Sequence, residues 1–376
     1  MSDKVGKTNR IRDVAARAGV SSATVSRVLA GKPHVSAAVR ERVLEAAQTL
    51  RYRPNRIARS LRVQRSRFVG LVVSDIQNPF FNRVVRAVED AVLPHGYAVF
   101  LCNTDENPER EALYLELFLD EQVAGIILTP THADAAAYSG FDFGGAGVPL
   151  VVIDRPVAGL AVDTVVSDNL EASRAVVAQL IARGHTRIGA VLSELSISTG
   201  RLRLEGYEQA LAGSGLESEA VFGKPVEAEG YRLAAALMER AEPPTALFTG
   251  SKLLTLGVLR YLFEHRIRVS ASGVGRPGVV ALAAFDDLDW LPETPEMLNV
   301  TQPAYDIGAQ AAALLLARIG EPLGSPVLRV LPSSVAWIGG RIDGNGVSGS
   351  GMEPSGVRVS GVKVSDIKVS GTEVPD

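Results

Sequence analysis

The feature that most constrains the fold is a long alternation of apolar strands and amphipathic helices, which begins at Phe68 and fills most of the 376 residues. Each predicted strand is an almost unbroken aliphatic run, as in FVGLVVS (68–74) and VVALAAF (279–285). Runs of this kind are typical of parallel strands whose sheet is covered by helices on both faces. The alternation therefore predicts an α/β protein built on parallel sheets.

The alternation runs twice, which predicts two lobes. The first round has strands at 68–74, 98–103, 125–130 and 149–154, with helices at 82–93 and 109–122. The second round has strands at 187–193, 245–250 and 279–285, with helices at 170–183, 203–212, 229–240 and 252–265. Because one more helical pattern follows at 306–319, we expect the chain to return to the first lobe.

Three short helical patterns precede this alternation, within residues 11–50. The first two meet at a tight turn, Gly19-Val20-Ser21, in which Ser21 can cap the second helix. The residues expected to face inward are Ile11, Val14, Ala15, Ala18, Val25, Val28, Leu29, Val39, Val43, Ala47 and Leu50. Two short helices joined by a glycine turn predict a helix-turn-helix motif.

Charge is distributed unevenly along the chain. Residues 1–67 contain sixteen Lys and Arg and four Asp and Glu, a charge of +12, whereas the remainder contains 23 and 38, a charge of −15. A basic arm on an acidic body suggests a polyanionic partner. Joined to the helix-turn-helix pattern, this asymmetry predicts a DNA-binding head.

The segment NRIARSLRVQRS (55–66) contains four arginines and no acidic residue. Its apolar residues recur at helical spacing, but a segment this short falls below the roughly 12–15 residues that a marginal helix needs in water. Too few apolar side chains are present to offset an ordering cost of about 1–2 kcal/mol per residue. We therefore expect this segment to fold only against a partner.

Several classes of protein and site are unexpected from this sequence. It has no apolar run long enough to span a membrane, no secretory leader pattern in MSDKVGKTNRIRDV, and a single cysteine, Cys102, which fits a reducing cytoplasm. The GxGxxG run at 273–278 precedes a predicted strand rather than a helix, so we expect no dinucleotide cofactor. The five histidines are scattered, so we expect no metal site. No nucleophile or acid–base constellation indicates an enzyme.

The run IRDVAARAGVSSATVSRVLAGKPHVSAAVRERVLEAAQTLRYRPNRIARSL strongly resembles the lactose/purine-repressor (LacI/GalR) family of transcription regulators. The resemblance continues through VGLVVSDIQNPFF, IDRP, STGRLRLEGY and FDDLDW, and covers roughly residues 9–340. It implies an N-terminal all-α helix-turn-helix head and an α/β core of two lobes with parallel sheets, like type I periplasmic binding proteins. It also implies a homodimer, because family operators are palindromic, and hence a cytoplasmic protein associated with the nucleoid.

The resemblance implies three segments, and the composition of the chain adds a fourth at its end. They are a helix-turn-helix head (9–54), a hinge helix (55–67), a two-lobed core for effector binding and dimerisation (68–340), and a Gly/Ser/Val-rich tail (341–376). We expect the first lobe at about 68–163 and 300–324, and the second at about 164–299 and 325–340. We expect the tail to be disordered, although its valines at every second position leave a strand open as an alternative.

The resemblance also implies which residues contact double-stranded DNA. In the recognition helix, Ser22–Leu29, it places Ser22, Ala23 and Arg27 at base edges in the major groove. Positions that would contact phosphates are Thr24, Ser26 and His34. In the hinge helix the resemblance selects Asn55, Ala58 and Leu61, of which Leu61 would wedge between the central base pairs. Ser22 alternatively supports only the helix cap.

The resemblance further implies a small-molecule effector between the lobes. The positions that match family ligand contacts are Asp75, Phe80, Phe81, Asp154, Thr199, Arg203, Asp286 and Trp290. Alternatives remain open: the two phenylalanines may belong to the core, Asp154 can pair with Arg155, and Trp290 can cap the cleft without touching ligand. Where many relatives have Asn-Asp, this chain has Ser251-Lys252, which favours an acidic ligand if the lysine points inward.

Taken together, these expectations describe a transcription regulator, a repressor, that binds a palindromic operator and is controlled by a sugar or sugar derivative. A purine or another metabolite is the alternative effector. A soluble sugar-binding protein without DNA-binding activity is the alternative function. Whether the effector releases DNA or tightens the complex stays open, as do the operator sequence and assembly beyond a dimer.

Overall fold

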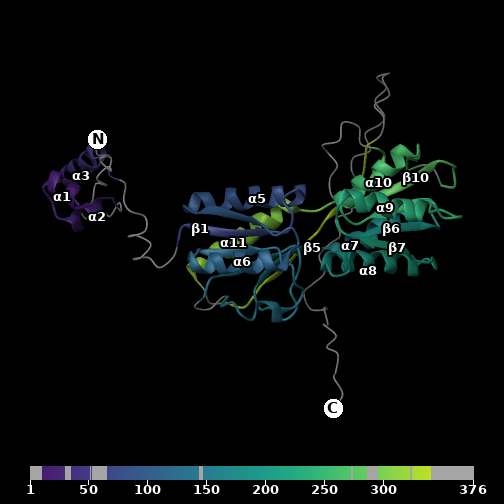
Figure 1. Cartoon of the computed structure of the whole chain (residues 1–376), viewed down its shortest axis with the longest axis horizontal. Coiled ribbons are helices and arrows are strands. Elements are labelled where there is room, and N and C mark those ends of the chain that lie inside the picture. The colour runs from purple at the N-terminus through teal and green to yellow at the C-terminus, as the bar shows by residue number, and fades with distance from the viewer. Residues whose placement is uncertain are drawn as a thin grey trace, which may run out of the picture. The chain divides into compact units, whose positions relative to one another are not determined.

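The computed structural model describes residues 11–29, 35–50, 52, 66–143, 147–271, 274–285, 295–321 and 324–339. The chain divides into two compact units, Met1–Ser66 and Arg67–Asp376 (Figure 1). The predicted hinge and tail lie almost wholly outside the described residues. So do six of the predicted contact residues: His34, Asn55, Ala58, Leu61, Asp286 and Trp290.

The first unit contains three helices, α1 (Ile11–Ala18), α2 (Ser22–Leu29) and α3 (Ala37–Thr49). Each helix contributes one fully buried valine to a shared core: Val14, Val25 and Val43. Gly19 adopts a φ of +66°, which glycine tolerates and which turns the chain between α1 and α2. The predicted helix-turn-helix and its apolar faces are therefore confirmed.

The first lobe of the core is a six-stranded parallel sheet with the order β12-β5-β4-β3-β1-β2. Its strands are β1 (Phe68–Val73), β2 (Ala98–Asn103), β3 (Gly125–Leu128), β4 (Leu150–Ile153), β5 (Asp163–Ser167) and β12 (Leu328–Leu331). Helices α5 (Pro79–Val92) and α11 (Ala304–Gly320) pack together on one face, and α6 (Pro108–Asp120) covers the other. Short 3-10 turns occupy Leu93–His95 and Ala135–Tyr138.

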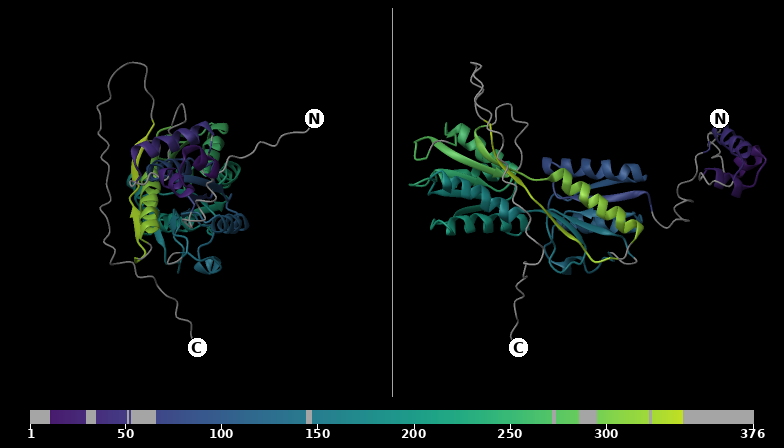
Figure 2. Two further views of the ribbon diagram at one scale, coloured as in Figure 1. Left: turned by 90° about the vertical axis from the view of Figure 1, so that its left-hand side faces the viewer. Right: turned by 180° about the vertical axis from the view of Figure 1, so that it is seen from behind.

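The second lobe lies on the left of the right-hand view in Figure 2. Its sheet is built around the order β13-β11-β10-β8-β6-β7, with a short strand β9 beside β10. Its strands are β6 (Ile188–Ser193), β7 (Glu219–Gly223), β8 (Ala246–Thr249), β9 (Arg268–Val269), β10 (Val279–Phe285), β11 (Met297–Thr301) and β13 (Ser334–Ile338). The sheet is parallel except for β13, which pairs antiparallel with β11. Helices α7 (Asn169–Ala182) and α8 (Ser198–Ala212) cover one face, and α9 (Glu227–Met238) and α10 (Lys252–Glu264) cover the other.

The predicted lobe boundaries need one correction. The strands β5 and β12 pair with each other in the first sheet, with Leu328 opposite Thr164 and Leu331 opposite Ser167. Residues 164–167 and 328–331 therefore belong to the first lobe, although the sequence suggested the second. The chain passes between the lobes after β5, after β11 and after β12, so both lobes are built from separate stretches of sequence.

One glycine fixes how closely two helices of the second lobe can approach. A Cβ at Gly206 in α8 would collide with the carbonyl oxygen of Leu170 in α7 and with the side chain of Ser173. Only glycine leaves room for this contact. The close pairing holds α8 against α7, and α8 carries Arg203, whose side chain enters the space between the lobes.

Candidate functional site

The recognition helix α2 begins at a side-chain cap. The Ser21 hydroxyl accepts a hydrogen bond from the backbone N–H of Thr24 at 3.1 Å and lies 2.9 Å from the Thr24 hydroxyl. Such a cap satisfies one of the backbone donors left free at a helix start. Capping thus falls to Ser21, as predicted, and Ser22 is half-buried in the first turn of the helix.

The two faces of α2 differ in character. Val25 and Val28 are buried in the core of the head, whereas Ala23 and Arg27 are exposed. Ser22, Thr24 and Ser26 are half-buried, which leaves their hydroxyls near the surface. The outer face of the helix therefore offers small side chains, hydroxyls and one guanidinium.

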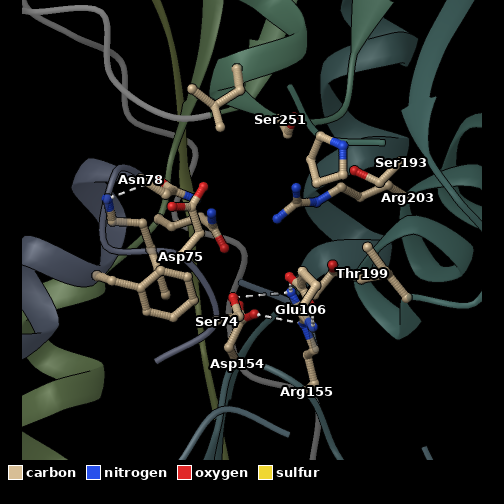
Figure 3. Close-up of a pocket in the computed structure, with 16 residues that line it drawn as sticks. Ser74, Asp75, Asn78, Glu106, Asp154, Arg155, Ser193, Thr199, Arg203 and Ser251 are labelled. Atoms are coloured by element: carbon tan, nitrogen blue, oxygen red, sulfur yellow. Dashed lines mark hydrogen bonds and ion pairs between the residues drawn. The ribbon is translucent and has the colours of Figure 1, made fainter. Parts of the chain in front are cut away.

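A pocket lies where the two lobes of the core face each other (Figure 3). It encloses about 540 Å³ of free space, part of which is open to solvent. Its lining residues are Ser74, Asp75, Asn78, Phe80, Phe81, Glu106, Asp154, Arg155, Ser193, Ile197, Thr199, Arg203, Pro225, Ser251, Leu253 and Gln302. The structure thus brings together all six described residues that the sequence predicted for the effector.

Arg203 enters the pocket from the second lobe, in the second turn of α8. Its Nε donates to the side-chain oxygen of Asn169 at 2.8 Å, Nη1 donates to the carbonyl of Gly250, and the guanidinium carbon lies 3.9 Å from the centre of the Phe285 ring. The side chain is only 6% exposed. These contacts fix the guanidinium in one orientation before any ligand arrives.

Asp154 directly follows β4 and has a φ of +66°, a conformation that costs a non-glycine residue of order 1–3 kcal/mol. Its carboxylate lies 3.3 Å from the Nε of Arg155, so the predicted alternative of pairing with Arg155 is present, and the residue also lines the pocket. Burial raises the pKa of Asp154, and the positive charges of Arg155 and Arg203 oppose that rise.

Arg155 is held by two hydrogen bonds to Glu106, with Nη1 at 2.6 Å from one carboxylate oxygen and Nη2 at 2.5 Å from the other. Burial disfavours the charged form of Arg155, but the bonds and charge of Glu106 outweigh it and raise the arginine's pKa. Glu106 has a left-handed φ of 57° and follows Asp105, whose φ is 52°. This pair ties the loop after β2 to the end of β4, and both residues line the pocket.

Asp75 and Asn78 lie just beyond the carboxyl end of β1. The Asp75 carboxylate accepts the backbone N–H of Gln77 at 2.8 Å, and the Asn78 side chain caps α5 by accepting the N–H of Phe80 at 3.0 Å. Burial is the largest cause of a raised pKa at Asp75, and the nearby acids Asp105 and Glu106 raise it further. Figure 3 shows Arg203 facing Asp75 across the pocket.

The sequence left open whether Phe80 and Phe81 belong to the core or to the pocket, and whether Lys252 points inward. Phe80 and Phe81 are 6% and 2% exposed, pack in the first-lobe core, and still line the pocket. Ser251 lines the pocket and caps α10. Lys252 is only 3% exposed, so it does not point outward, yet it does not line the pocket.

Sequence reasoning missed several lining residues, above all Glu106, Ser193 and Gln302. Glu106 and Ser193 lie at the carboxyl ends of β2 and β6. Because ligands bind at that end of parallel strands, the place of these two residues after predicted strands could have indicated them. Gln302 lies on the segment that crosses from β11 to α11, which no pattern in the sequence indicated.

Neither a membrane-spanning helix nor a metal site is found in the part of the chain that the structure describes. No helix there combines the length and apolar character needed to cross a membrane. No group of three or more His, Cys, Asp or Glu side chains there is arranged to hold a metal ion. The predicted strand after the GxGxxG run is present as β10.

Two family models match the chain, and together they cover both of its compact units. Residues 66–332 match the model described as periplasmic binding proteins and sugar binding domain of the LacI family, and residues 10–55 match that of bacterial regulatory proteins of the lacI family. The first match alone covers more than half of the chain.

Individual relatives match most of the chain. The chain is 32% identical over 317 residues to a probable HTH-type transcriptional regulator, EndR, of Paenibacillus polymyxa, which covers 83% of this chain and 91% of that protein. It is 31% identical over 319 residues to the ribose operon repressor of Escherichia coli (strain K12), which covers 83% and 93%.

Solved structures give the same result. A transcriptional regulator CelR–cellobiose complex is 31% identical, covers 88% of this chain and all of that one, and has a TM-score of 0.64. The lac repressor dimer bound to operator and the anti-inducer ONPF is 25% identical, covers 88% and 98%, and has a TM-score of 0.75. The chain therefore belongs to the LacI family of transcription regulators, with a DNA-binding helix-turn-helix domain at residues 10–55 and an effector-binding core of two α/β lobes.

Proposed function

We propose that this chain forms a homodimer that represses transcription by binding an inverted-repeat operator, under the control of a sugar or sugar derivative held between the lobes. One observation carries the effector proposal: carboxylates of the first lobe, Asp75 and Asp154, and the guanidinium of Arg203 from the second lobe line the same pocket. Such groups form paired hydrogen bonds with neighbouring hydroxyls. Phe80 supplies an aromatic wall for the apolar face of a sugar ring.

The relatives support the same class of ligand. The CelR structure is a complex with cellobiose, and two relatives of about 31–32% identity are named ribose operon repressors. Sugars present the neighbouring hydroxyls that this pocket's charged groups are suited to bind. Asp286 and Trp290, outside the described residues, remain predicted contacts.

A ligand that touches Asp75 and Arg203 together would favour the arrangement in which the lobes stay close. An effector shifts a conformational equilibrium only through its different affinities for the two states. The proposed effector acts by this route because its contacts come from both lobes, and separation of the lobes would break one set of them.

The dimer proposal rests on apolar side chains at the surface of the first lobe. Phe100 and Leu101 on the edge strand β2 are 43% and 38% exposed, and Leu113 and Leu117 on α6 are 52% and 48% exposed. Exposed apolar clusters commonly mark contact surfaces between proteins. Two heads held by a dimer would fit the two halves of a palindromic site.

In the proposed DNA complex, Arg27 reads guanine and Ala23 offers only a methyl contact, because both are exposed on the outer face of α2. Thr24, Ser26 and His34 contact phosphates, which position the head without specifying sequence. Ser22 contributes at base edges, and Asn55, Ala58 and Leu61 act in the minor groove.

The effector proposal is tested with Arg203→Met and the matched control Arg201→Met. Both arginines lie in α8, but Arg201 is exposed and donates to the carbonyl of Leu195 outside the pocket. In calorimetric titrations with a panel of sugars and sugar phosphates, we expect one class to bind the parent protein and the control alike. We expect at least about a tenfold loss in Arg203→Met, since each 1.4 kcal/mol of lost binding is tenfold. Equal affinity in both variants, or binding of a nucleobase alone, would refute a sugar site at Arg203.

A further inference from the structure

Among the residues that the structure describes, the strand β12 forms an edge of the first-lobe sheet, where it pairs with β5 alone. The N–H of Thr164 donates to the carbonyl of Val327 at 2.8 Å, and the N–H of Asp168 donates to that of Leu331 at 3.1 Å. Residues 327, 329 and 331 thus face β5. Since a strand alternates, the backbone groups of Leu328 and Val330 point away from the sheet and are available to another strand.

The side chains of these same residues are also uncovered. Leu328 is 49% exposed and Val330 is 50% exposed. Leu328 and Val330 pair in register with two buried residues of β5, Thr164 and Val166. They therefore lie on the sheet face that α6 covers. The apolar core on that face contains no residue of β12. Proteins usually protect such edges. An extended segment with aliphatic side chains two residues apart would complete both the hydrogen bonding and the packing.

The chain contains such a segment beyond the described residues. Residues 356–375 read GVRVS, GVKVS, DIKVS and GTEVP, four copies of a five-residue unit. In the first three copies, two β-branched apolar residues flank one basic residue, which suits a strand with one buried and one solvated face. We propose that a Val-basic-Val unit of residues 356–370 adds to β12 of the same chain as an outer strand, with its valines beside Leu328 and Val330.

The length of the intervening chain fits this docking. Ile338 at the end of β13 is seven residues beyond Leu331, so the two are at most about 23 Å apart at 3.3 Å per residue. Residues 340–356 are rich in Gly and Ser, and the root-mean-square length expected from such a composition is about 5–6 Å times the square root of the residue count, or about 23 Å. A linker whose mean length matches the span gives the highest effective concentration.

Intrachain docking is favoured over a second copy of the chain at the same edge. A short tether holds the repeats near β12 at an effective concentration of about a millimolar, well above the usual protein concentration in solution. Three interchangeable units raise the chance that one is docked at any moment. The proposal is independent of the effector and the operator, because neither Leu328 nor Val330 lines the pocket.

Residue-resolved hydrogen exchange on the full chain tests this proposal. The comparison variant keeps the tail length and replaces its valines and isoleucine at 357, 359, 362, 364, 367 and 369 with serine. We expect the amides of Leu328 and Val330 to exchange at least about fivefold more slowly in the parent chain. The amide of Arg329, which faces β5, should exchange alike in both and serves as the internal reference.

Two further variants keep the test decisive. Val330→Asp should abolish the difference between the two tails, whereas Leu93→Asp, at an exposed leucine of the same lobe, should leave it unchanged. Equal exchange at Leu328 and Val330 with either tail would overturn the proposal. Protection that rises with protein concentration would overturn it as well, because a second copy would then cover the edge.

Discussion

One charged residue, Asp163, joins three elements of the first lobe that are far apart in the sequence. Asp163, at the start of β5, accepts hydrogen bonds from Arg318 at 2.7 and 2.8 Å and from the backbone N–H of Val327 at 2.8 Å. It thereby joins β5, α11 and the start of β12. Burial alone would raise the pKa of Asp163, but these bonds outweigh burial and lower it.

We predict that Asp163→Asn destabilises the core by about 2–3 kcal/mol at pH 7, because it removes a charged acceptor and leaves Arg318 without its carboxylate. A carboxyl with a lowered pKa stabilises the fold above its unfolded pKa of about 3.9, and this contribution disappears as the pH falls through the lower folded value. The difference between parent and variant should therefore shrink below about pH 4 in urea unfolding. Glu242→Gln, in an exposed pair at 3.9 Å, is the control and should change stability by less than about 1 kcal/mol. A constant difference across this pH range would contradict the assignment.

The sequence indicated six of the sixteen residues that line the pocket, but not their conformations. The resemblance selected Asp154, yet nothing in the sequence indicated its left-handed backbone, because the constraint comes from β5 and Arg155. The partner of Arg155, Glu106, is 49 residues away in the sequence. No local pattern connects residues so far apart.

At the scale of elements, two helix starts in the head provide a natural comparison. Ser21 and Ser36 each precede a helix, but only Ser21 makes a side-chain hydrogen bond to the backbone of that helix. The cap of α2 is therefore a specific contribution to the recognition helix, whereas α3 depends on the burial of Val43, Ala46 and Ala47.

We predict that Ser21→Ala destabilises the head by about 1 kcal/mol, since it removes the acceptor for the Thr24 N–H. Ser36→Ala should cost less than about half of this, because no such bond is lost. Thermal unfolding of the full chain, followed by the exchange of amides in α2, measures the difference. Equal effects of both substitutions would show that the Ser21 contact contributes nothing.

The strands that sequence reasoning missed lack an unbroken aliphatic run. The strands β5, β7, β11, β12 and β13 each include polar, charged or aromatic residues, as in DTVVS and MLNVT. The strands that were predicted, such as β1 and β10, are mostly aliphatic. Burial does not separate the two groups, because β5 is buried and was missed, whereas the exposed edge strand β2 was predicted.

At the scale of the whole molecule, the asymmetry of charge assigns binding of DNA to one end of the chain. Residues 1–67 have a charge of +12, against −15 in the remainder. Lys and Arg bind DNA largely by releasing counterions from its phosphates, so affinity falls as salt rises.

If about eight phosphates are neutralised per dimer, we predict that the logarithm of operator affinity falls against the logarithm of salt with a slope of about −7. Fluorescence anisotropy with an inverted-repeat oligonucleotide, selected from a random pool, measures this slope. Arg27→Ala should also reduce preference for the selected site over a scrambled one by about 1–3 kcal/mol. A slope near zero, or no preference over scrambled DNA, would refute operator binding by this head.

The sequence by itself determined the kinds of element and the division into a basic head and a two-lobed α/β core, because burial, capping and charge leave local patterns. Its resemblance to a known family selected six of the sixteen residues that line the pocket. The tertiary structure decided that β5 and β12 belong to the first lobe, since strand pairing joins residues 164 and 328. It also decided that Glu106 holds the guanidinium of Arg155. These outcomes depend on contacts between segments 49 or more residues apart, whose free energies exist only once the chain has folded.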